Sequence, residues 1–501
     1  MNRKFRNWVF KLHTWLGLHL SIFFAFLFLT GTLLVVGLEL ESIARPAIWT
    51  TVNKEDRTAS FSTIYQGIKK AHPESDVFNI TKRPTPWFAD RSTGHTGWGE
   101  IVNFWTDPVT GEVVAESRTV GFSSILRNLH DSLLTTKQTV VLVISASSIL
   151  LFLQMTSGLV TYRRFWKGLF RWPNSSNGPR SWAGGAHRLT AVWAVPLVLL
   201  IAVTSFCFFL GELGYADKVP QPKPTAERET ALPSDFGPAA IDRAEALARN
   251  ALPGFEPVEM LIPGRKTESI KFIGHQDGYS ELSGSSSVSI DPLTFEILGA
   301  FAPDDSRGLA RWYTLVEMLH FGTWGGAFSR GLWVLLGFAS TAVALTGALV
   351  FAARLAPNAA QYGPLRRIWR GLGWSRWIYL LILLGILVAA YLRFGPDSVR
   401  KSWIHPVDTP GSVARLILNE PLRRDRPLDV ALRLGEPDVE EASVVVNNGD
   451  AQQLELTQVR EKPQAQFRIL PSDTSMEITV RLKKTDNSEQ IVNFRLGRPI
   501  W

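Results

Sequence analysis

The chain alternates between long apolar runs and longer polar segments. Its 501 residues contain five apolar runs, each long enough to cross a hydrocarbon core of about 30 Å as a helix. The runs cover approximately residues 16–40, 139–162, 189–210, 332–352 and 377–392. The pattern predicts a mainly α-helical membrane protein with five transmembrane helices. The first run follows a basic segment but exceeds the apolar core of a secretory signal, so we interpret it as an uncleaved anchor.

Basic residues predict the orientation of these helices. Residues 1–13, 163–188 and 354–376 contain 15 of the 53 Lys and Arg residues and no Asp or Glu. Because short loops rich in Lys and Arg stay in the cytoplasm, we expect the N-terminus there and the C-terminus in the periplasm, across a bacterial inner membrane. The net charge of +8 is a property of these loops and indicates no nucleic-acid binding.

The expected domain order follows from this orientation. Transmembrane segments at 1–40, 139–162, 189–210, 332–353 and 377–393 enclose cytoplasmic loops at 163–188 and 354–376 and periplasmic regions at 41–138, 211–331 and 394–501. From about residue 416 the last region has alternating, strand-like runs separated by polar turns. We therefore expect an all-β domain at the C-terminus, bound to the bilayer by the fifth helix.

The first four helices carry an internal duplication. Histidine and threonine recur at matching spacings of 17 residues in His13–Thr30 and His187–Thr204, and of 26 residues in His130–Thr156 and His320–Thr346. Each unit runs helix, outside segment, helix, which predicts two parallel repeats about an axis along the membrane normal. The outside segments also share Asp-Pro-x-Thr turns, at residues 107–110 and 291–294, so we expect two small α+β domains.

Short motifs surround the histidines of the first and fourth helices. They are KLHTWLGL at 11–18, TG at 30–31, LHFG at 319–322, Gly326, Arg330 and TG at 346–347. These motifs resemble the signatures of the PepSY-associated transmembrane family, over roughly residues 1–356. The resemblance implies two PepSY-like outside domains and an iron-regulated membrane protein or ferric-siderophore reductase with b-type haem between helix histidines. The fifth helix and the β domain lie outside the resemblance.

Four histidines are the candidate haem-iron ligands. His13 and His187 belong to the cytoplasmic ends of the first and third helices, and His130 and His320 to the outside ends of the second and fourth. Iron takes two imidazoles that face each other from different helices, so we expect one haem b in each layer and two in all. A lone histidine at such a position usually caps a helix or reaches the interface; the duplicated spacing favours ligation. The only cysteine, Cys207, excludes covalent haem attachment.

One distance conflicts with a simple two-layer arrangement. His130 precedes Arg164 by 34 residues, so a straight helix would span about 50 Å and carry the outer haem to or beyond the membrane surface. A tilt of the helix, a break near Thr135 and Thr136, or a deeper site that uses His19 would each shorten the distance between the two haems. His19 faces another side of the first helix from the first ligand, as either a supporting or substitute ligand or a buried core histidine.

The arginines and the tryptophans near the candidate ligands each have two possible roles. Arg163, Arg164 and Arg354 end the second and fourth helices, where they anchor the bundle in lipid headgroups or contact haem propionates. Trp312 and Trp324 flank the histidine of the fourth helix, either as part of an interfacial aromatic belt or as a wall that stacks on an aromatic ligand.

The remaining motifs limit the function. The sequence has no Walker A motif, no GxGxxG after a strand and no flavin signature, so electrons must come from another molecule. We expect a transmembrane electron conduit: a cytoplasmic-side or quinol donor reduces the inner haem, and the outer haem passes the electron to a periplasmic acceptor. Ferric siderophore is the acceptor that the resemblance implies, and no catalytic residue is assigned. The alternative is a haem-free scaffold whose PepSY-like and β domains bind or regulate a periplasmic partner.

Overall fold

The fold is that of a computed structural model. It describes residues 2–73, 75–82, 87–95, 101–118, 122–135, 138–162, 164–174, 179–215, 222–223, 231–233, 235–264, 268–279, 285–306, 308–355, 363–394, 404–407, 414–418, 427–435, 438–447, 449–459, 462–470 and 476–496. The chain forms two compact units. One holds Met1–Gln66, Phe78–Thr93 and Asn103–Ile386, and the other holds Gly67–Val77, Gly94–Val102 and Leu387–Trp501.

Helices precede and follow two strand-rich stretches. The helices are α1 (Arg3–Val35), α2 (Gly37–Ala44), α3 (Phe61–Ala71), α4 (Phe122–Ser132), α5 (Gln138–Thr161), α6 (Pro179–Glu212), α7 (Pro238–Ala251), α8 (Gly308–Phe321), α9 (Gly326–Leu355), α10 (Pro364–Gly371) and α11 (Ser375–Phe394). Short 3₁₀ turns occur at Pro46–Ile48, Lys54–Asp56, Phe165–Gly168 and Pro303–Asp305. The strands are β1 (Asp76–Thr81), β2 (Asp90–His95), β3 (Ile101–Thr106), β4 (Val113–Arg118), β5 (Phe255–Leu261), β6 (Ile270–Gln276), β7 (Ser286–Ile290), β8 (Ile297–Phe301), β9 (Ile404–Val407), β10 (Ala414–Leu418), β11 (Leu428–Leu434), β12 (Val439–Val446), β13 (Ala451–Leu454), β14 (Thr457–Val459), β15 (Lys462–Ile469), β16 (Met476–Lys484) and β17 (Glu489–Leu496).

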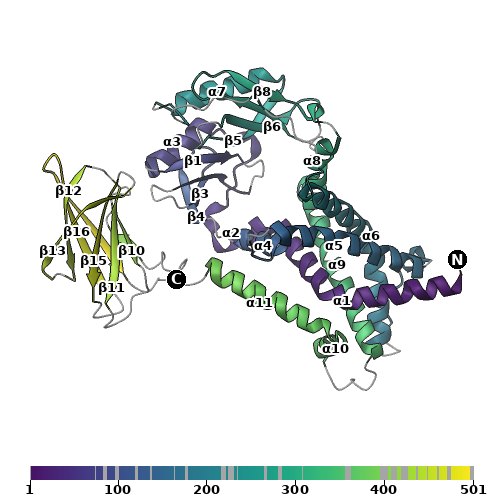
Figure 1. Ribbon diagram of the computed structural model, residues 1–501. Helices are drawn as coiled ribbons and strands as arrows, with labels where there is room; N and C mark the ends of the chain where they lie inside the picture. The colour runs from purple at the N-terminus through teal and green to yellow at the C-terminus, as the bar shows by residue number, and fades with distance from the viewer. Residues whose placement is uncertain are drawn as a thin grey trace. The chain divides into compact units, whose positions relative to one another are not determined.

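Four long helices form a bundle: α1, α5, α6 and α9 (Figure 1). α1 packs against α5 and α9, and α6 packs against the same two helices. Small residues permit these approaches; a Cβ added at Gly337 of α9 would collide with the Thr32 hydroxyl of α1. All four helices are long and apolar enough to cross a membrane within Arg3–Val35, Gln138–Thr161, Ser181–Glu212 and Gly326–Phe351. The prediction of a membrane protein built on these helices is confirmed.

The fifth predicted span is not confirmed. α11 does form where it was expected, but its apolar stretch Ser375–Tyr391 is shorter than the other four. Its side chains are nevertheless exposed and apolar; Leu381 and Leu384 are 68% and 57% exposed. At its start, the Tyr379 hydroxyl donates to the carbonyl oxygen of His19 on α1. α11 is therefore an apolar helix attached to the bundle at one end, and its crossing of the membrane stays a prediction.

The two α+β segments share one sheet. The strand order is β4-β3-β2-β1-β5-β6-β7-β8, and antiparallel pairing of Asn79 with Leu261 and Ile80 with Met260 joins the halves. The two Asp-Pro-x-Thr turns form as expected. Asp107 Oδ1 accepts hydrogen bonds from two backbone amides, both at 2.8 Å. Asp291 Oδ1 likewise accepts from two backbone amides, at 2.9 and 3.1 Å. Joining the sheets covers one edge of each half, which leaves fewer unpaired strand edges.

Helix breaks separate the outer histidines from the spanning helices. α4 ends at Ser132, and Leu133 and Leu134 then have φ of 51° and 65°, a left-handed conformation that ends a helix. α8 ends at Phe321, and Gly322 has φ of 71° before α9 begins. Of the three ways to shorten the helix that carries His130, the structure shows a break, one to two residues before the expected place.

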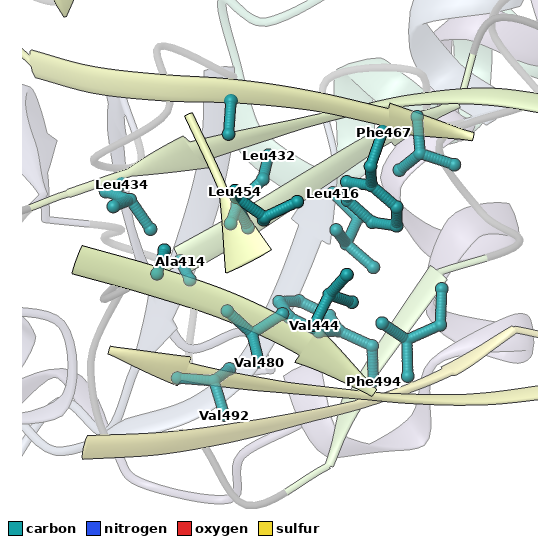
Figure 2. Packing of buried hydrophobic residues seen from close by; sticks show 14 of the residues in the cluster. Ala414, Leu416, Leu432, Leu434, Val444, Leu454, Phe467, Val480, Val492 and Phe494 are labelled. Atoms are coloured by element: carbon teal, nitrogen blue, oxygen red, sulfur yellow. The ribbon is translucent and has the colours of Figure 1, made fainter. Parts of the chain in front are cut away.

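The C-terminal strands form a two-sheet β domain. The sheets have the orders β10-β11-β15-β14 and β13-β12-β16-β17-β9. Alternate side chains of β16, from Met476 to Leu482, point into the core, where Leu416, Phe467 and Phe494 pack between the sheets (Figure 2). Every regular element in the described part of residues 404–496 is a strand. The expected β-rich C-terminal region is present.

Candidate functional site

The inner pair is His13 on α1 and His187 on α6. His13 Nδ1 donates to the carbonyl oxygen of Gln154 on α5 at 3.0 Å, and His187 Nδ1 donates to the carbonyl oxygen of Val343 on α9 at 3.0 Å. A carbonyl oxygen only accepts, so Nδ1 carries the proton in both rings and Nε2 keeps its lone pair. A metal-binding imidazole needs this tautomer, held in place by the hydrogen bond of its other nitrogen.

Glycines make room for both inner rings. A Cβ added at Gly158 of α5 would lie 3.0 Å from His13 Cε1, and one added at Gly347 of α9 would lie 3.0 Å from His187 Cε1. A larger residue at either position would displace the ring. Gly158 and Gly347 therefore have equivalent places in the two repeats of the structure. The sequence repeat, which matches Thr156 with Thr346, differs from this equivalence by one residue.

The inner pair lines a cavity inside the bundle. The cavity has a volume of ≈ 370 Å³, is walled by α1, α5, α6 and α9, and is mainly apolar. This volume falls within the range typical of small-molecule and cofactor sites. Gly17, Gly158 and Gly347 line it beside the two histidines, and Arg188, the residue after His187, lines it as well. The cavity thus combines two imidazoles whose Nε2 atoms keep a lone pair, small residues, and one guanidinium.

The outer pair is His130 on α4 and His320 on α8. His130 Nδ1 lies 3.1 Å from Thr30 Oγ1 on α1, and His320 Nδ1 lies 2.9 Å from Thr204 Oγ1 on α6. Each threonine hydroxyl donates its proton to a carbonyl one turn earlier in its own helix, at 2.9 and 2.8 Å. The threonine oxygens therefore accept from Nδ1, and Nε2 keeps its lone pair in these rings too.

The separation of the outer rings fits a shared metal. The ring centroids of His130 and His320 are 6.4 Å apart, and the ring planes are inclined by 59°. An imidazole nitrogen binds a metal at about 2.0–2.1 Å, and the centroid lies roughly 1.1 Å behind it, so two opposed rings on one metal have centroids roughly 6.3 Å apart. The centroid distance of the outer pair therefore matches that of two imidazoles on one metal ion.

Both outer imidazoles are biased toward the neutral form. Burial lowers the pKa of His130, with smaller opposing effects from Asp131 and from a backbone hydrogen bond. Burial and, to a smaller extent, the neighbouring His130 lower the pKa of His320 to about 3. α4 and α8 are not spanning helices, so these environments are set by protein contacts. A neutral imidazole is the form that binds iron.

The two pairs occupy separate levels of the bundle. The outer rings contact α1 at Thr30 and α6 at Thr204, each 17 residues after the inner histidine of the same helix. At 1.5 Å per residue, the levels are about 26 Å apart along the helices. The helix breaks therefore return the outer pair to the bundle and remove the conflict that a straight helix of about 50 Å would create.

Phenylalanines, rather than the two expected tryptophans, contact the outer pair. The ring of Phe208 on α6 lies 5.1 Å from that of His320, and Phe321 lies 5.8 Å from it. Trp312 is 60% exposed, and Trp324 packs edge-on against Trp333 at 5.7 Å. Neither expected tryptophan makes a described ring contact with that histidine.

Trp333 holds the end of the helix that carries His320. Its Nε1 donates to the carbonyl oxygens of Leu319 and His320 at 3.0 and 3.3 Å. A Cβ at Gly322 would collide with the Trp333 ring at 2.6 Å, so the break after α8 depends on this glycine both for its φ and for its size. Sequence reasoning missed Trp333, although it lies close to the break.

His19 belongs to a different cluster. Its Nδ1 lies 2.9 Å from Ser375 Oγ, at the start of α11, and that hydroxyl donates to a carbonyl at 2.9 Å. The rings of Trp15 and Trp374 lie 5.0 and 6.0 Å from it. These contacts place His19 at the junction of α1 with α11. It does not line the inner cavity, so the structure offers it no contact with the inner pair.

The arginines expected near the inner haem are placed unevenly. Arg164 is exposed at the end of the second helix. Arg163 and the side chain of Arg354 lie outside the described residues. Arg188 is the arginine that lines the cavity, and its position directly after a candidate ligand was the signal that could have identified it.

Arg330, from the fourth-helix motif, ties the bundle together at the outer level. Its guanidinium donates to the carbonyl oxygen of Val35 at 2.6 Å and pairs with Glu39 at 2.6 Å, which fixes α9 against α1 and α2. On the opposite side, the Gln138 side chain at the start of α5 donates to Glu212 at the end of α6. Polar links of this kind fix helix positions within a bundle.

Comparison with known proteins gives a family match. A family model described as the PepSY-associated TM region matches residues 10–354, which contain all four candidate ligands. No curated protein matches the chain. Within the described residues, no group of three or more His, Cys, Asp or Glu side chains is arranged to hold a metal ion.

Proposed function

Since the chain belongs to the family of the PepSY-associated TM region, we propose that it is a haem-binding electron conduit that reduces a ferric chelate on the far side of the membrane. The observation that carries the proposal is the shared arrangement of the four histidines. Each gives its Nδ1 proton to an oxygen on a neighbouring helix and keeps Nε2 unprotonated. A capping or interfacial histidine has no need of such paired orientation.

The residues present suit two molecules of haem b. His130 and His320 would be the axial ligands of the outer haem, and His13 and His187 those of the inner haem. Arg188 would pair with a propionate of the inner haem. Haem supplies one-electron redox chemistry when bound. The chain itself orients the imidazoles through Gln154 and Val343, and through the two threonines at the outer level, and lines the inner cavity mainly with apolar side chains.

The donor and the acceptor follow from the two levels. The basic loops predict that the inner pair faces the cytoplasm, where a cytoplasmic-side or quinol donor would supply electrons. The outer pair would deliver them to a periplasmic acceptor, for which the family resemblance suggests a ferric siderophore. The oxygen donors of such a chelate hold the more highly charged ferric ion more strongly, so reduction releases iron. The protein would thereby take part in iron uptake at a bacterial inner membrane.

A scaffold function is the second candidate. The β domain and the shared eight-stranded sheet are two regions outside the helix bundle that an electron conduit does not require. These domains could bind or regulate a periplasmic partner without haem. The scaffold explains the β domain, whereas the conduit explains the orientation of the four histidines.

A measurement of electron transfer across a bilayer distinguishes the electron conduit from the scaffold. Full-length protein would be reconstituted into vesicles that contain dithionite, with a ferric hydroxamate chelate outside. We expect the external ferric chelate to be reduced only when the vesicles contain protein, and the His187→Ala variant to abolish the reaction. Equal rates in vesicles with and without protein would exclude the conduit and leave the scaffold.

The location of the C-terminus needs its own test because α11 is short. A reporter fused after Trp501 should register as periplasmic if α11 crosses the membrane. A cytoplasmic signal would show that α11 does not cross, or that the orientation is inverted.

A further inference from the structure

The junction of α1 with α11 is an addition to the duplicated bundle. The residue six positions after His13 is His19, whereas the residue six positions after His187 is Trp193. The indole Nε1 of Trp193 donates to a backbone carbonyl at 2.8 Å. His19 instead contacts α11, a helix that has no counterpart in the two repeats and lies beyond the family match. The histidine and the fifth helix are therefore two features outside the duplication, and they are in contact.

One ring nitrogen of His19 remains available to another molecule. The Ser375 hydroxyl donates its proton to the carbonyl oxygen of Leu372 at 2.9 Å, so its oxygen accepts the Nδ1 proton of His19 at 2.9 Å. Nε2 therefore keeps its lone pair, and within the described residues it has no hydrogen-bond partner. An ionisable side chain on an apolar helix long enough to cross a membrane usually has a function, so this nitrogen indicates a ligand.

The fold holds this imidazole in place from two sides. The Tyr379 hydroxyl donates to the backbone carbonyl of His19. Gly373, with φ of 57°, forms the turn between α10 and α11, in a left-handed conformation that glycine adopts readily. The next two residues are Trp374 and Ser375, which both contact the imidazole, and the serine is only 4% exposed. The acceptor nitrogen is thus positioned before a ligand arrives, which lowers the entropy cost of binding.

Two exposed indoles flank the imidazole. The ring of Trp15 lies 5.0 Å from that of His19 at an interplanar angle of 61°, and the ring of Trp374 lies 6.0 Å from it at 31°. The two tryptophans are 53% and 66% exposed. Their ring surfaces are therefore open to a second planar ring, for which aromatic side chains have a stacking preference. A ligand at this junction meets one hydrogen-bond acceptor and two aromatic surfaces.

We propose that the junction of α1 with α11 binds the headgroup of a membrane quinol, with a ring hydroxyl donating to His19 Nε2 and the indoles of Trp15 and Trp374 contacting the ring. The ligand must dissolve in the bilayer, because the junction lies on an apolar helix. It must also donate a hydrogen bond, which acyl chains, ester carbonyls and ionised phosphates do not. A lipid with a hydroxylated headgroup has the donor but no ring for the indoles.

This inference rests on the proposed function, for which it names the class of electron donor. His19 follows His13 by six residues, so the junction lies about 9 Å further along α1. It faces another side of that helix and does not line the inner cavity. A quinol and an inner haem would therefore occupy neighbouring places without competing for one.

His19→Asn and His19→Gln are the matched variants for the acceptor. The asparagine amide lies near the position of Nδ1, so it can still donate to Ser375 but leaves the position of Nε2 empty; the glutamine amide reaches the position of Nε2. Trp374→Leu removes an exposed indole without risk to folding. Trp8→Leu is its control, because Trp8 is 59% exposed on the same helix as His19 and its ring contacts Phe5.

Binding would be measured on detergent-solubilised full-length protein with 2-heptyl-4-hydroxyquinoline N-oxide, a fluorescent analogue of a quinol headgroup. The wild type should bind the analogue saturably, and decylubiquinol should displace it. His19→Asn and Trp374→Leu should each weaken binding about tenfold, whereas His19→Gln and Trp8→Leu should retain most of the affinity. Displacement by phosphatidylglycerol but not by decylubiquinol would indicate a lipid site and overturn the proposal.

The proposal also fails if the wild type does not bind the analogue, or if His19→Asn binds it as tightly as the wild type. A protein that contains no haem but binds the analogue through His19 would contradict the proposed function and support the quinol site. A protein that reduces the external ferric chelate with internal dithionite but binds no analogue would do the reverse.

Discussion

The inner and outer histidine pairs have the same tautomer, with Nδ1 protonated, but different parts of the fold hold their rings. His13 and His187 are on the spanning helices themselves and face a cavity between all four. His130 and His320 are on short helices that end at breaks and contact the bundle from outside its helices. Glycines of the bundle make room for the inner rings and, at Gly31 of α1, for His130 as well. The outer pair depends in addition on the backbone at two breaks and on the domains attached to them.

The largest expected effect is loss of one whole haem when a ligand is removed. His130→Ala should halve the haem content and spare the inner site, and adding His320→Ala should cause no further loss, because one missing axial ligand disables a site that both residues share. His13→Ala and His187→Ala should remove the other half in the same way. Haem per chain would be measured by absorption after extraction.

His19→Ala is the control for this series, since His19 contacts α11 and not the cavity. Its haem content should equal that of the wild type. Equal loss in the His19 and His13 variants would contradict the assignment of the inner pair.

A bulky residue in place of Gly347 should affect the inner pair alone. In Gly347→Val, the added side chain begins 3.0 Å from His187 Cε1 and must displace the ring, so the inner haem should be largely lost. Gly331→Val is the matched control on the same helix, because a Cβ there meets no atom within 4 Å. Haem content of the two variants would be compared at equal expression, and equal retention would contradict the cavity as the inner site.

Loss of a threonine acceptor should have a smaller effect at the outer level. Thr204→Val removes the oxygen that accepts from His320 Nδ1, so haem affinity at that site should fall about 10- to 100-fold while the ligand itself remains. Thr204→Ser keeps the hydroxyl and should restore most of the affinity. Affinity would be obtained from haem-transfer rates; a Val variant that behaves like the wild type would show that this hydrogen bond does not orient the ring.

The smallest expected effect is that of removing the β domain. A chain truncated after Gly395 retains the bundle and both histidine pairs, so its absorption spectrum should match that of the full chain. Loss of haem in the truncated protein would show that the second compact unit contributes to the cofactor sites.

The sequence was sufficient for features that depend on local pattern. Apolar length predicted the four spans, and Asp-Pro-x-Thr predicted two turns, because each rests on residues close together in the chain. The helix break was placed one to two residues late, since Leu133 and Leu134 adopt positive φ without the glycine that usually marks it. The joined sheet was not foreseen because it requires β1 to pair with a strand some 180 residues later.

The candidate site likewise combines features that follow from the sequence pattern with features that depend on contacts in the folded chain. The four candidate histidines were predicted from their repeated spacing, and the structure places them in two pairs. The aromatic neighbours were not found, because Phe208 precedes its contact His320 by more than a hundred residues and nearby Trp312 turned out to be exposed.

The haem-to-protein ratio of the purified full-length chain tests the central claim most directly. The protein would be produced with ample haem, extracted in detergent and measured by absorption against its amino-acid content. Two histidine pairs at separate levels predict two haems b per chain, with the spectrum of iron held by two imidazoles. A ratio of zero or one would contradict the account, because at least one of the two pairs would then serve another purpose.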